Sequence, residues 1–125
     1  MLFATLPSGR RLSYAKPRIG TNRFGNEGII FEGVGASRKW MEIETFSGKL
    51  AENVTQAVAR DILSHAISTL RHTGIVMHIH DELVIEADPH MSTEVLCQQM
   101  SRTPPWAEGL LLRADGFDCP YYQKD

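Results

Sequence analysis

Residues 74–86 read Gly74-Ile75-Val76-Met77-His78-Ile79-His80-Asp81-Glu82-Leu83-Val84-Ile85-Glu86. Two runs rich in β-branched residues, Ile75 to Ile79 and Leu83 to Ile85, flank a pair of acids. Such runs around a short polar segment are typical of a β-hairpin, and Asp is a good turn former. The pattern therefore predicts a hairpin with the carboxylates of Asp81 and Glu82 at its tip.

This pair of acids has three interpretations. In the first, Asp81 and Glu82 are ordinary solvated turn residues. In the second, His78, His80 and Asp81 bind zinc, because a His-x-His pair on a strand directs both imidazoles to one face, although no clear third and fourth ligands follow in the sequence. In the third, the two carboxylates belong to a magnesium site for phosphoryl transfer, where protein oxygens share the metal with substrate phosphates and water.

The stretch from Val76 to Val84 resembles motif C of the family A DNA polymerases, the DNA polymerase I type, in which a His-Asp-Glu triplet lies at the tip of a hairpin in the palm subdomain. The segment from Lys49 to Asp61, with its central Gln, is similar to the helix that precedes this hairpin, particularly in phage-type members. Two shorter segments, Leu6 to Leu12 and Pro104 to Leu110, also resemble phage-type sequences. The resemblance therefore covers nearly the whole chain.

The resemblance implies a role for each of five residues. Asp81 would be the metal ligand, Glu82 a neighbouring catalytic acid, and His80 a contact to the primer backbone near its end. Gln56 and Asn53 would donate hydrogen bonds to minor-groove acceptors of primer-template DNA, which all base pairs share. The family's reaction joins a primer 3′-hydroxyl to the α-phosphate of a deoxynucleoside triphosphate, with two magnesium ions. Mg²⁺ is thus the implied cofactor, in a completed active site only.

The chain lacks parts that the resemblance requires for activity. No Asp-Tyr-Ser-like strand supplies the family's first metal-binding Asp, and no fingers helix is present to hold the triphosphate. An Asp-Glu pair alone cannot hold two magnesium ions, because Mg²⁺ binds protein weakly without substrate phosphates. We therefore expect a C-terminal palm segment that is inactive alone and needs an upstream polymerase segment. The alternative is a non-catalytic DNA-binding or protein-interaction module left from a truncated prophage polymerase.

Length and charge bound these possibilities. The chain has 125 residues, of which 42% are hydrophobic, and this suits a single domain over residues 1–125 with one packed core. The net charge is -2, so any DNA contact depends on local basic residues. The clearest such cluster, which is also explained by an ordinary solvated loop, consists of Arg10, Arg11, Lys16 and Arg18.

Two further features concern the cellular setting. Cys97 and Cys119 form no Cys-x-x-Cys pair, so no disulfide framework is expected. The N-terminus lacks the charged and apolar regions of a signal peptide, and no apolar run approaches the roughly 20 residues of a membrane span. A cytoplasmic protein without a membrane partner is therefore expected.

The N-terminal half is expected to be mostly extended. The turn formers Pro7-Ser8-Gly9 predict a short hairpin from Phe3 to Tyr14. Pro, Gly and Asn residues predict a long surface loop from Ala15 to Gly28. Two further strands are expected at Gly28 to Gly33 and at Trp40 to Phe46.

Two helices are expected. Apolar residues recur at three- and four-residue steps from Lys49 to Arg71, which predicts an amphipathic helix of about six turns with Ser47 as its N-cap. On its polar surface, Gln56 and Arg60 are i,i+4 neighbours. A shorter helix from Ser92 to Met100 is expected to bury Val95, Leu96 and Met100, and a last strand is expected from Leu110 to Gly116.

These elements predict an α+β fold, in which an antiparallel sheet carries the motif C hairpin and is backed by the long amphipathic helix and the shorter helix. In the resembling family, a further strand pairs beside this hairpin, and the chain offers no candidate for it. An unpaired strand edge can pair with another chain, so we also expect a homodimer or a tendency to aggregate.

Overall fold

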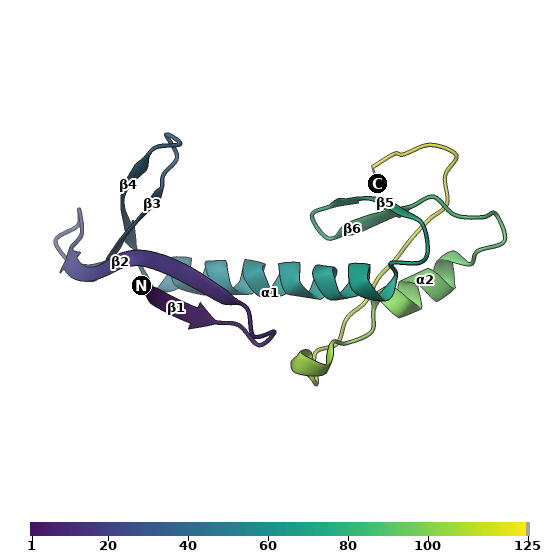
Figure 1. The fold of residues 1–125 in the computed structure, drawn as a ribbon, viewed down its shortest axis with the longest axis horizontal. Coiled ribbons are helices and arrows are strands. Elements are labelled where there is room, and N and C mark those ends of the chain that lie inside the picture. The colour runs from purple at the N-terminus through teal and green to yellow at the C-terminus, as the bar shows by residue number, and fades with distance from the viewer. Residues whose placement is uncertain (125) are drawn as a thin grey trace. The chain divides into compact units, whose positions relative to one another are not determined.

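The computed structural model describes residues 1–124, and Figure 1 labels its elements along the chain. These residues contain one four-stranded antiparallel sheet, one two-stranded antiparallel sheet and two α-helices. The predicted α+β class is therefore confirmed. The chain divides into two compact units, Met1–Val58 and the residues from Ala59 onward, and the boundary falls inside the long helix α1 (Ser47–Thr69). Each unit is described by itself.

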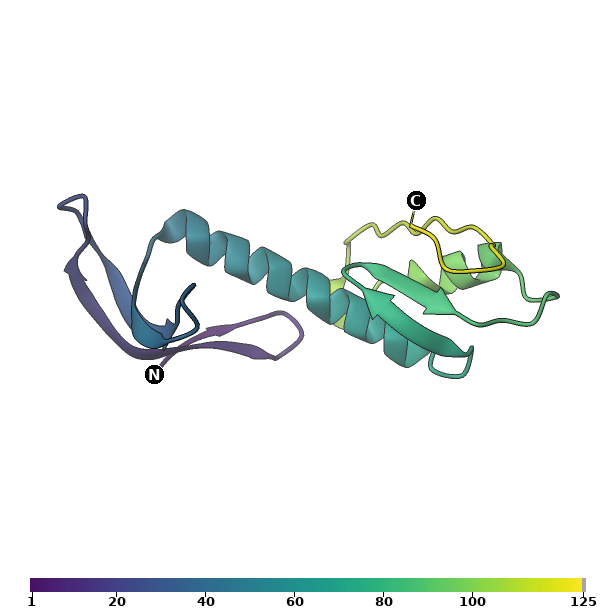
Figure 2. The same ribbon diagram turned by 90° about the horizontal axis from the view of Figure 1, so that it is seen from above.

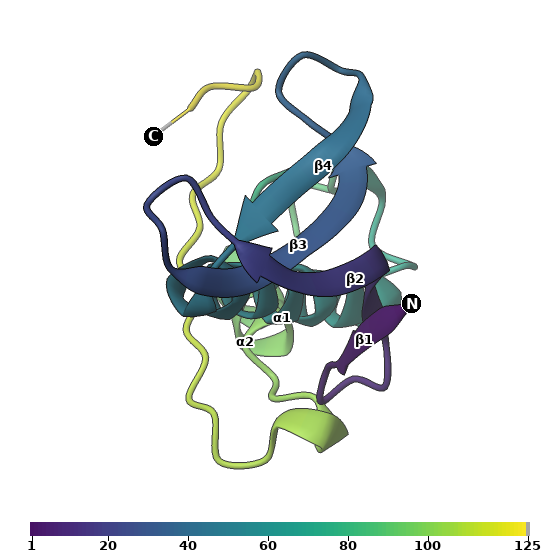
Figure 3. The ribbon, with the colours of Figure 1, turned by 90° about the vertical axis from the view of Figure 1, so that its left-hand side faces the viewer.

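Unit 1 contains the four-stranded sheet, and Figure 3 shows β2, β3 and β4 lying side by side. The predicted hairpin around Pro7-Ser8-Gly9 is confirmed, because Leu2 pairs with Tyr14 and Thr5 with Arg11. The two later strands are confirmed as well. The strands are β1 (Leu2–Thr5), β2 (Arg11–Thr21), β3 (Glu27–Val34) and β4 (Trp40–Thr45).

The surface loop predicted from Ala15 to Gly28 is wrong, because β2 continues to Thr21 and pairs with β3. The pairing register shifts between Ala15 and Arg18, and Lys16 has a φ of 43°. These are the marks of a β-bulge, where an extra residue is accommodated and a proline such as Pro17 is tolerated. The residues that suggested a loop instead form a bulge and a tight turn.

The core of unit 1 joins the sheet to the first half of α1. Its buried apolar side chains are Leu6, Tyr14, Ile30 and Ala57. The Tyr14 ring packs edge-to-face on Phe31, with ring centroids 5.0 Å apart and an interplanar angle of 81°. Such an aromatic pair contributes about 0.5–1.5 kcal/mol beyond its buried area.

Unit 2 contains the rest of α1, the hairpin of β5 (Ile75–Ile79) and β6 (Glu82–Ile85), the helix α2 (Thr93–Met100) and a 3₁₀ turn (Pro105–Ala107). Figure 2 shows β5 and β6 as antiparallel neighbours. The most buried side chains of this unit are Leu63, Ala66, Leu70 and Pro104. The apolar face predicted for the long helix therefore supplies most of this core.

The two helix starts differ in how well the sequence marks them. The Leu50 N–H donates to the Phe46 carbonyl at 3.0 Å, so Phe46 holds the cap position of α1 and Ser47, the predicted N-cap, is already helical. In α2 the predicted cap is confirmed, because the Ser92 Oγ accepts a hydrogen bond from the Val95 N–H at 3.4 Å.

The C-terminal region differs from the sequence prediction in two ways. Val95 is 48% exposed and does not belong to a buried stripe of α2, whereas Leu96 is half-buried. The segment from Leu110 to Gly116 is not a strand, because it pairs with no strand among the described residues. It approaches α2 instead, since a Cβ added at Gly116 would come within 2.9 Å of the Cys97 Sγ.

None of the helices in the described part of the chain combines the length and the hydropathy that crossing a bilayer requires.

Candidate functional site

The tip of the β5–β6 hairpin is the first candidate site. The hairpin is confirmed, but its loop consists of His80 and Asp81, not of the two acids. Glu82 is the first residue of β6 and pairs with Ile79, so its predicted place at the tip is wrong. The reason is the pairing register, in which a two-residue loop closes directly on the Ile79–Glu82 pair.

The loop conformation fixes how its first residue is presented. His80 has a φ of 53°, whereas Asp81 does not have a positive φ. A positive φ at the first loop residue alone is the φ pattern of a type II′ turn, which matches the twist of the flanking strands. Gly is the usual residue at this position, because it adopts a positive φ without steric strain. For an L-residue such as His80, the same conformation costs free energy.

The base of the hairpin is closed by Gly74 and Glu86. The Glu86 N–H donates to the Gly74 carbonyl at 3.0 Å, and Gly74 has a φ of 86°. A Cβ at this position would lie 2.6 Å from the Glu86 carbonyl oxygen, which is too close for any side chain. Gly74 therefore both ends the turn after α1 and allows the two strand ends to meet.

The acids at the tip have different surroundings. Asp81 and His80 are exposed, and Glu82 is half-buried. Among residues 1–124, no hydrogen bond or ion pair engages the Asp81 carboxylate, which leaves both of its oxygens available as acceptors. An exposed carboxylate without a partner can serve as one ligand of a hard cation such as Mg²⁺.

The fit of a metal ion to these residues is incomplete. Within the described residues, no group of three or more His, Cys, Asp or Glu side chains is placed to hold a metal ion. The zinc interpretation of His78, His80 and Asp81 therefore gains no support from the geometry. Asp81 can supply one ligand to a magnesium ion, but the other ligands would have to come from outside these residues.

Asn53 and Gln56 belong to unit 1, whereas the hairpin tip belongs to unit 2. The half-buried Asn53 donates from Nδ2 to the Tyr14 hydroxyl at 3.4 Å. The exposed Gln56 donates from Nε2 to the Glu52 Oε1 at 3.3 Å, and not to Arg60. One amide is thus tied to the core, and the other makes a solvated contact along the helix.

The four basic residues that could have formed a DNA-binding cluster are engaged within unit 1. Lys16 pairs with Glu32 at 3.0 Å, and Arg18 pairs with Glu42 at 2.8 Å. The Arg10 guanidinium donates to the Ala57 carbonyl at 3.0 Å, and that of Arg11 lies 5.6 Å from the Phe3 ring centroid. The charges of Lys16 and Arg18 are therefore balanced by carboxylates across the sheet.

Glu32 is the centre of a small network that the sequence did not indicate. Its Oε2 accepts from the Trp40 indole Nε1 at 2.8 Å, and its Oε1 accepts from the Lys16 Nζ at 3.0 Å. The indole hydrogen bond first, and then Lys16, lower the pKa of the Glu32 carboxyl below its usual value of 4.5. The strands β2, β3 and β4 contribute one member each, so only the strand pairing brings these residues together.

Arg60 makes a contact that helix periodicity alone could not reveal. Its Nη1 lies 3.4 Å from the Nδ1 of His78 on β5, and both side chains are exposed. Gln56 lies on the same helix as the i,i+4 neighbour of Arg60, as predicted, but its amide donates to Glu52 instead. No local sequence signal links a helix residue to a strand residue eighteen positions later.

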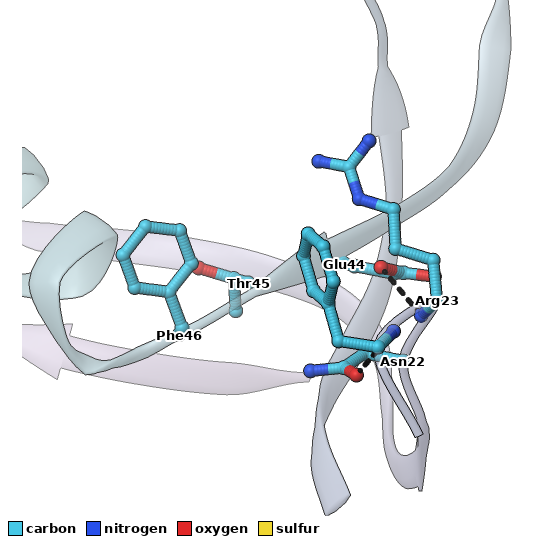
Figure 4. A pocket seen from close by; sticks show the side chains of 6 residues that line it. Asn22, Arg23, Glu44, Thr45 and Phe46 are labelled. Atoms are coloured by element: carbon cyan, nitrogen blue, oxygen red, sulfur yellow. Dashed lines mark hydrogen bonds between the residues drawn. The ribbon is translucent and has the colours of Figure 1, made fainter. Parts of the chain in front are cut away.

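A shallow pocket of about 330 Å³ lies in unit 1, where the β2–β3 turn meets the end of β4 (Figure 4). The Arg23 N–H donates to the Glu44 Oε2 at 3.3 Å, and the buried Thr45 Oγ1 has no hydrogen-bond partner among the described residues. None of the five predicted site residues belongs to its lining, which consists of Asn22, Arg23, Phe24, Glu44, Thr45 and Phe46.

Comparison with known proteins adds one relative. The chain is 45% identical over 130 aligned positions to a DNA polymerase of Bacillus phage SP02. This chain is similar to part of a phage DNA polymerase. The alignment covers all of the chain but spans only 20% of the length of that polymerase. No protein-family profile and no solved structure matches the chain. The predicted resemblance to a phage DNA polymerase is confirmed, while family A and motif C stay predictions.

Proposed function

We propose that this chain is part of a DNA-directed DNA polymerase of the family A, phage type, and that it contributes the motif C hairpin of the palm. The observation that carries the proposal is the 45% identity to a phage DNA polymerase along the whole chain. The hairpin supports it, because a two-residue loop presents His80 and Asp81 to solvent. The proposed partners are primer-template DNA, a deoxynucleoside triphosphate and an upstream polymerase segment.

In this proposal Asp81 supplies one ligand to the Mg²⁺ of a completed site, and Glu82 is the neighbouring acid. When bound there, Mg²⁺ would stabilise charge on the entering and leaving oxygens of nucleotidyl transfer. The unpartnered carboxylate of Asp81 suits this role. His80 would donate from its imidazole to the primer backbone, since its place in the loop leaves the ring exposed.

Gln56 and Asn53 are the proposed minor-groove contacts. An amide N–H can donate to the acceptors that every base pair offers in the minor groove, so such contacts are independent of sequence. The exposed Gln56 amide would have to exchange the Glu52 carboxylate for DNA. The Asn53 amide has one N–H left after its contact with the Tyr14 hydroxyl.

A chimeric polymerase tests the proposal. This chain would replace the segment of the SP02 phage polymerase that it aligns with, and primer extension would be measured with Mg²⁺ and all four triphosphates. We expect the chimera to extend the primer and the isolated chain to show no extension. An Asp81→Asn chimera should lose extension, because the amide cannot provide an anionic metal ligand.

The matched control is Glu86→Gln, which also removes one exposed carboxylate next to the same hairpin. This variant should retain activity, because Glu86 lies at the base of the hairpin. Extension by the Asp81→Asn chimera at the level of the Glu86→Gln chimera would overturn the assignment of Asp81. Clear extension by the purified chain alone would contradict the proposal that the active site needs other segments.

A further inference from the structure

We propose that Arg60 and His78 form a binding site for a backbone phosphate of nucleic acid. The inference rests on the proposed function, and adds a contact that the resemblance does not supply. Its starting point is the 3.4 Å contact between the Arg60 Nη1 and the His78 Nδ1. Both residues lie in unit 2 and are exposed.

The chemistry of this contact determines what the pair can bind. A guanidinium has N–H donors and no acceptor, so the His78 Nδ1 must accept the hydrogen bond from Arg60. The proton of the neutral imidazole then lies on Nε2. The pair therefore offers the remaining guanidinium N–H groups and the Nε2–H, all of which are donors. A ligand that suits it must supply several acceptor oxygens, as a phosphate does.

The charge of the pair also favours an anion. Within residues 1–124, Arg60 has no ion pair with a carboxylate, whereas Lys16, Arg18, Lys49 and Arg113 each pair with one. The Arg60 guanidinium thus keeps its positive charge unbalanced at the surface. A planar guanidinium binds phosphate oxygens through two N–H groups at once, which makes Arg a common phosphate ligand.

The position of the pair points to nucleic acid. His78 lies on β5 two residues before His80, the proposed primer contact in the loop, and two residues of chain span at most about 7 Å. Neighbouring phosphates along one nucleic-acid strand are separated by a comparable distance. A strand that passes His80 can therefore bring a second phosphate to Arg60 and His78. The pair would position the strand without reading its sequence.

The chain contains a matched control for this site. The Arg71 Nε donates to the His72 Nε2 at 3.0 Å, and both of these residues are exposed in unit 2 as well. This second Arg–His pair follows the end of α1 and precedes β5, so it has the same chemistry but does not lie on the hairpin. A site defined by its position should distinguish the two pairs, whereas a general effect of charge should not.

The experiment measures binding of a fluorescently labelled primer-template duplex to the full chain by anisotropy, over a series of salt concentrations. Arg60→Gln should weaken binding about threefold to tenfold. It should also reduce the slope of log affinity against log salt by about one, as expected when one phosphate contact is lost. Arg60→Lys should restore most of the slope, and Arg71→Gln should match the unchanged chain.

Each other outcome has a definite meaning. If Arg60→Gln binds like the unchanged chain, or if Arg71→Gln loses as much, the phosphate site is overturned and the proposed polymerase role stands. If Arg60→Lys is as weak as Arg60→Gln and neither changes the salt slope, Arg60 only supports the hairpin and the inference fails. If the unchanged chain does not bind DNA at all, this inference is overturned, and primer extension by the chimera still tests the polymerase role separately.

Discussion

The Nδ2 amide of Asn53 donates to the Tyr14 hydroxyl at 3.4 Å, which links α1 to β2 inside unit 1. The Tyr14 ring is buried and also packs against Phe31. The hydrogen bond therefore fixes an amide that was expected to contact DNA. This relationship separates the structural role of Asn53 from its proposed binding role.

Tyr14→Phe should lower the free energy of unfolding by about 0.5–1.5 kcal/mol, because it removes the acceptor of a partly buried amide. Urea unfolding followed by circular dichroism measures the effect, with the exposed Ser13→Ala as the control. A double-mutant cycle with Asn53→Ala isolates the pair. Additive losses in that cycle would show that the contact contributes nothing.

Gln56→Ala in the chimeric polymerase should weaken use of primer-template DNA about threefold to tenfold, as expected for one lost hydrogen bond. The dependence on Mg²⁺ should not change, because a neutral amide contributes little to a magnesium site. Gln98→Ala is the matched control, since Gln98 also contacts a glutamate four residues earlier. Equal behaviour of the two variants would make Gln56 an ordinary solvated residue.

Trp40→Phe should raise the pKa of Glu32 towards its usual value of 4.5, because the indole hydrogen bond is the main cause that lowers it. A lowered pKa in the folded state adds stability above pH 4.5, and this contribution is lost as the pH falls through the folded pKa. Carboxyl titration by NMR measures the shift. Lys16→Met should raise the pKa less, and the reverse order would contradict the assignment.

His80→Gly should keep the hairpin intact and yet reduce primer extension by the chimera. Gly adopts a positive φ without the cost of about 1 kcal/mol or more that His80 carries at 53°, so the stability of the isolated chain should hold or increase. Unfolding in urea and primer extension are the two measurements. Unchanged extension would remove the proposed primer contact of the imidazole.

The isolated chain should form a homodimer or aggregate through the β5–β6 hairpin. These two strands form a two-stranded sheet, which is marginally stable by itself and has unpaired edges. Light scattering gives the oligomeric state, and amide hydrogen exchange shows whether Val76, His78 and Val84 are protected. A monodisperse monomer with fast exchange at these positions would refute the covered edge.

The elements whose signals are local could be predicted from the order of the residues. Turn formers flanked by apolar runs predicted the hairpins at Pro7-Ser8-Gly9 and at Asp81, and three- and four-residue periodicity predicted α1. Ser92 marked the start of α2 because its side chain caps the first turn of its own helix. In each case, the interactions that stabilise the element join residues close in the chain. A short segment of sequence therefore contains the pattern that predicts the element.

The features that depend on partners distant in the chain could not be predicted in this way. Pro17 and its neighbours suggested a loop. In the structure, β2 pairs with β3 on both sides of these residues, which form a bulge in β2. The same pairing brings Lys16 to Glu32, and packing within unit 2 brings Arg60 to His78. Which acid stands at the hairpin tip depended on the Ile79–Glu82 register. A one-residue change of register keeps the hydrophobic runs recognisable and yet moves every side chain, so only the paired strands could place Asp81 in the loop and Glu82 on β6.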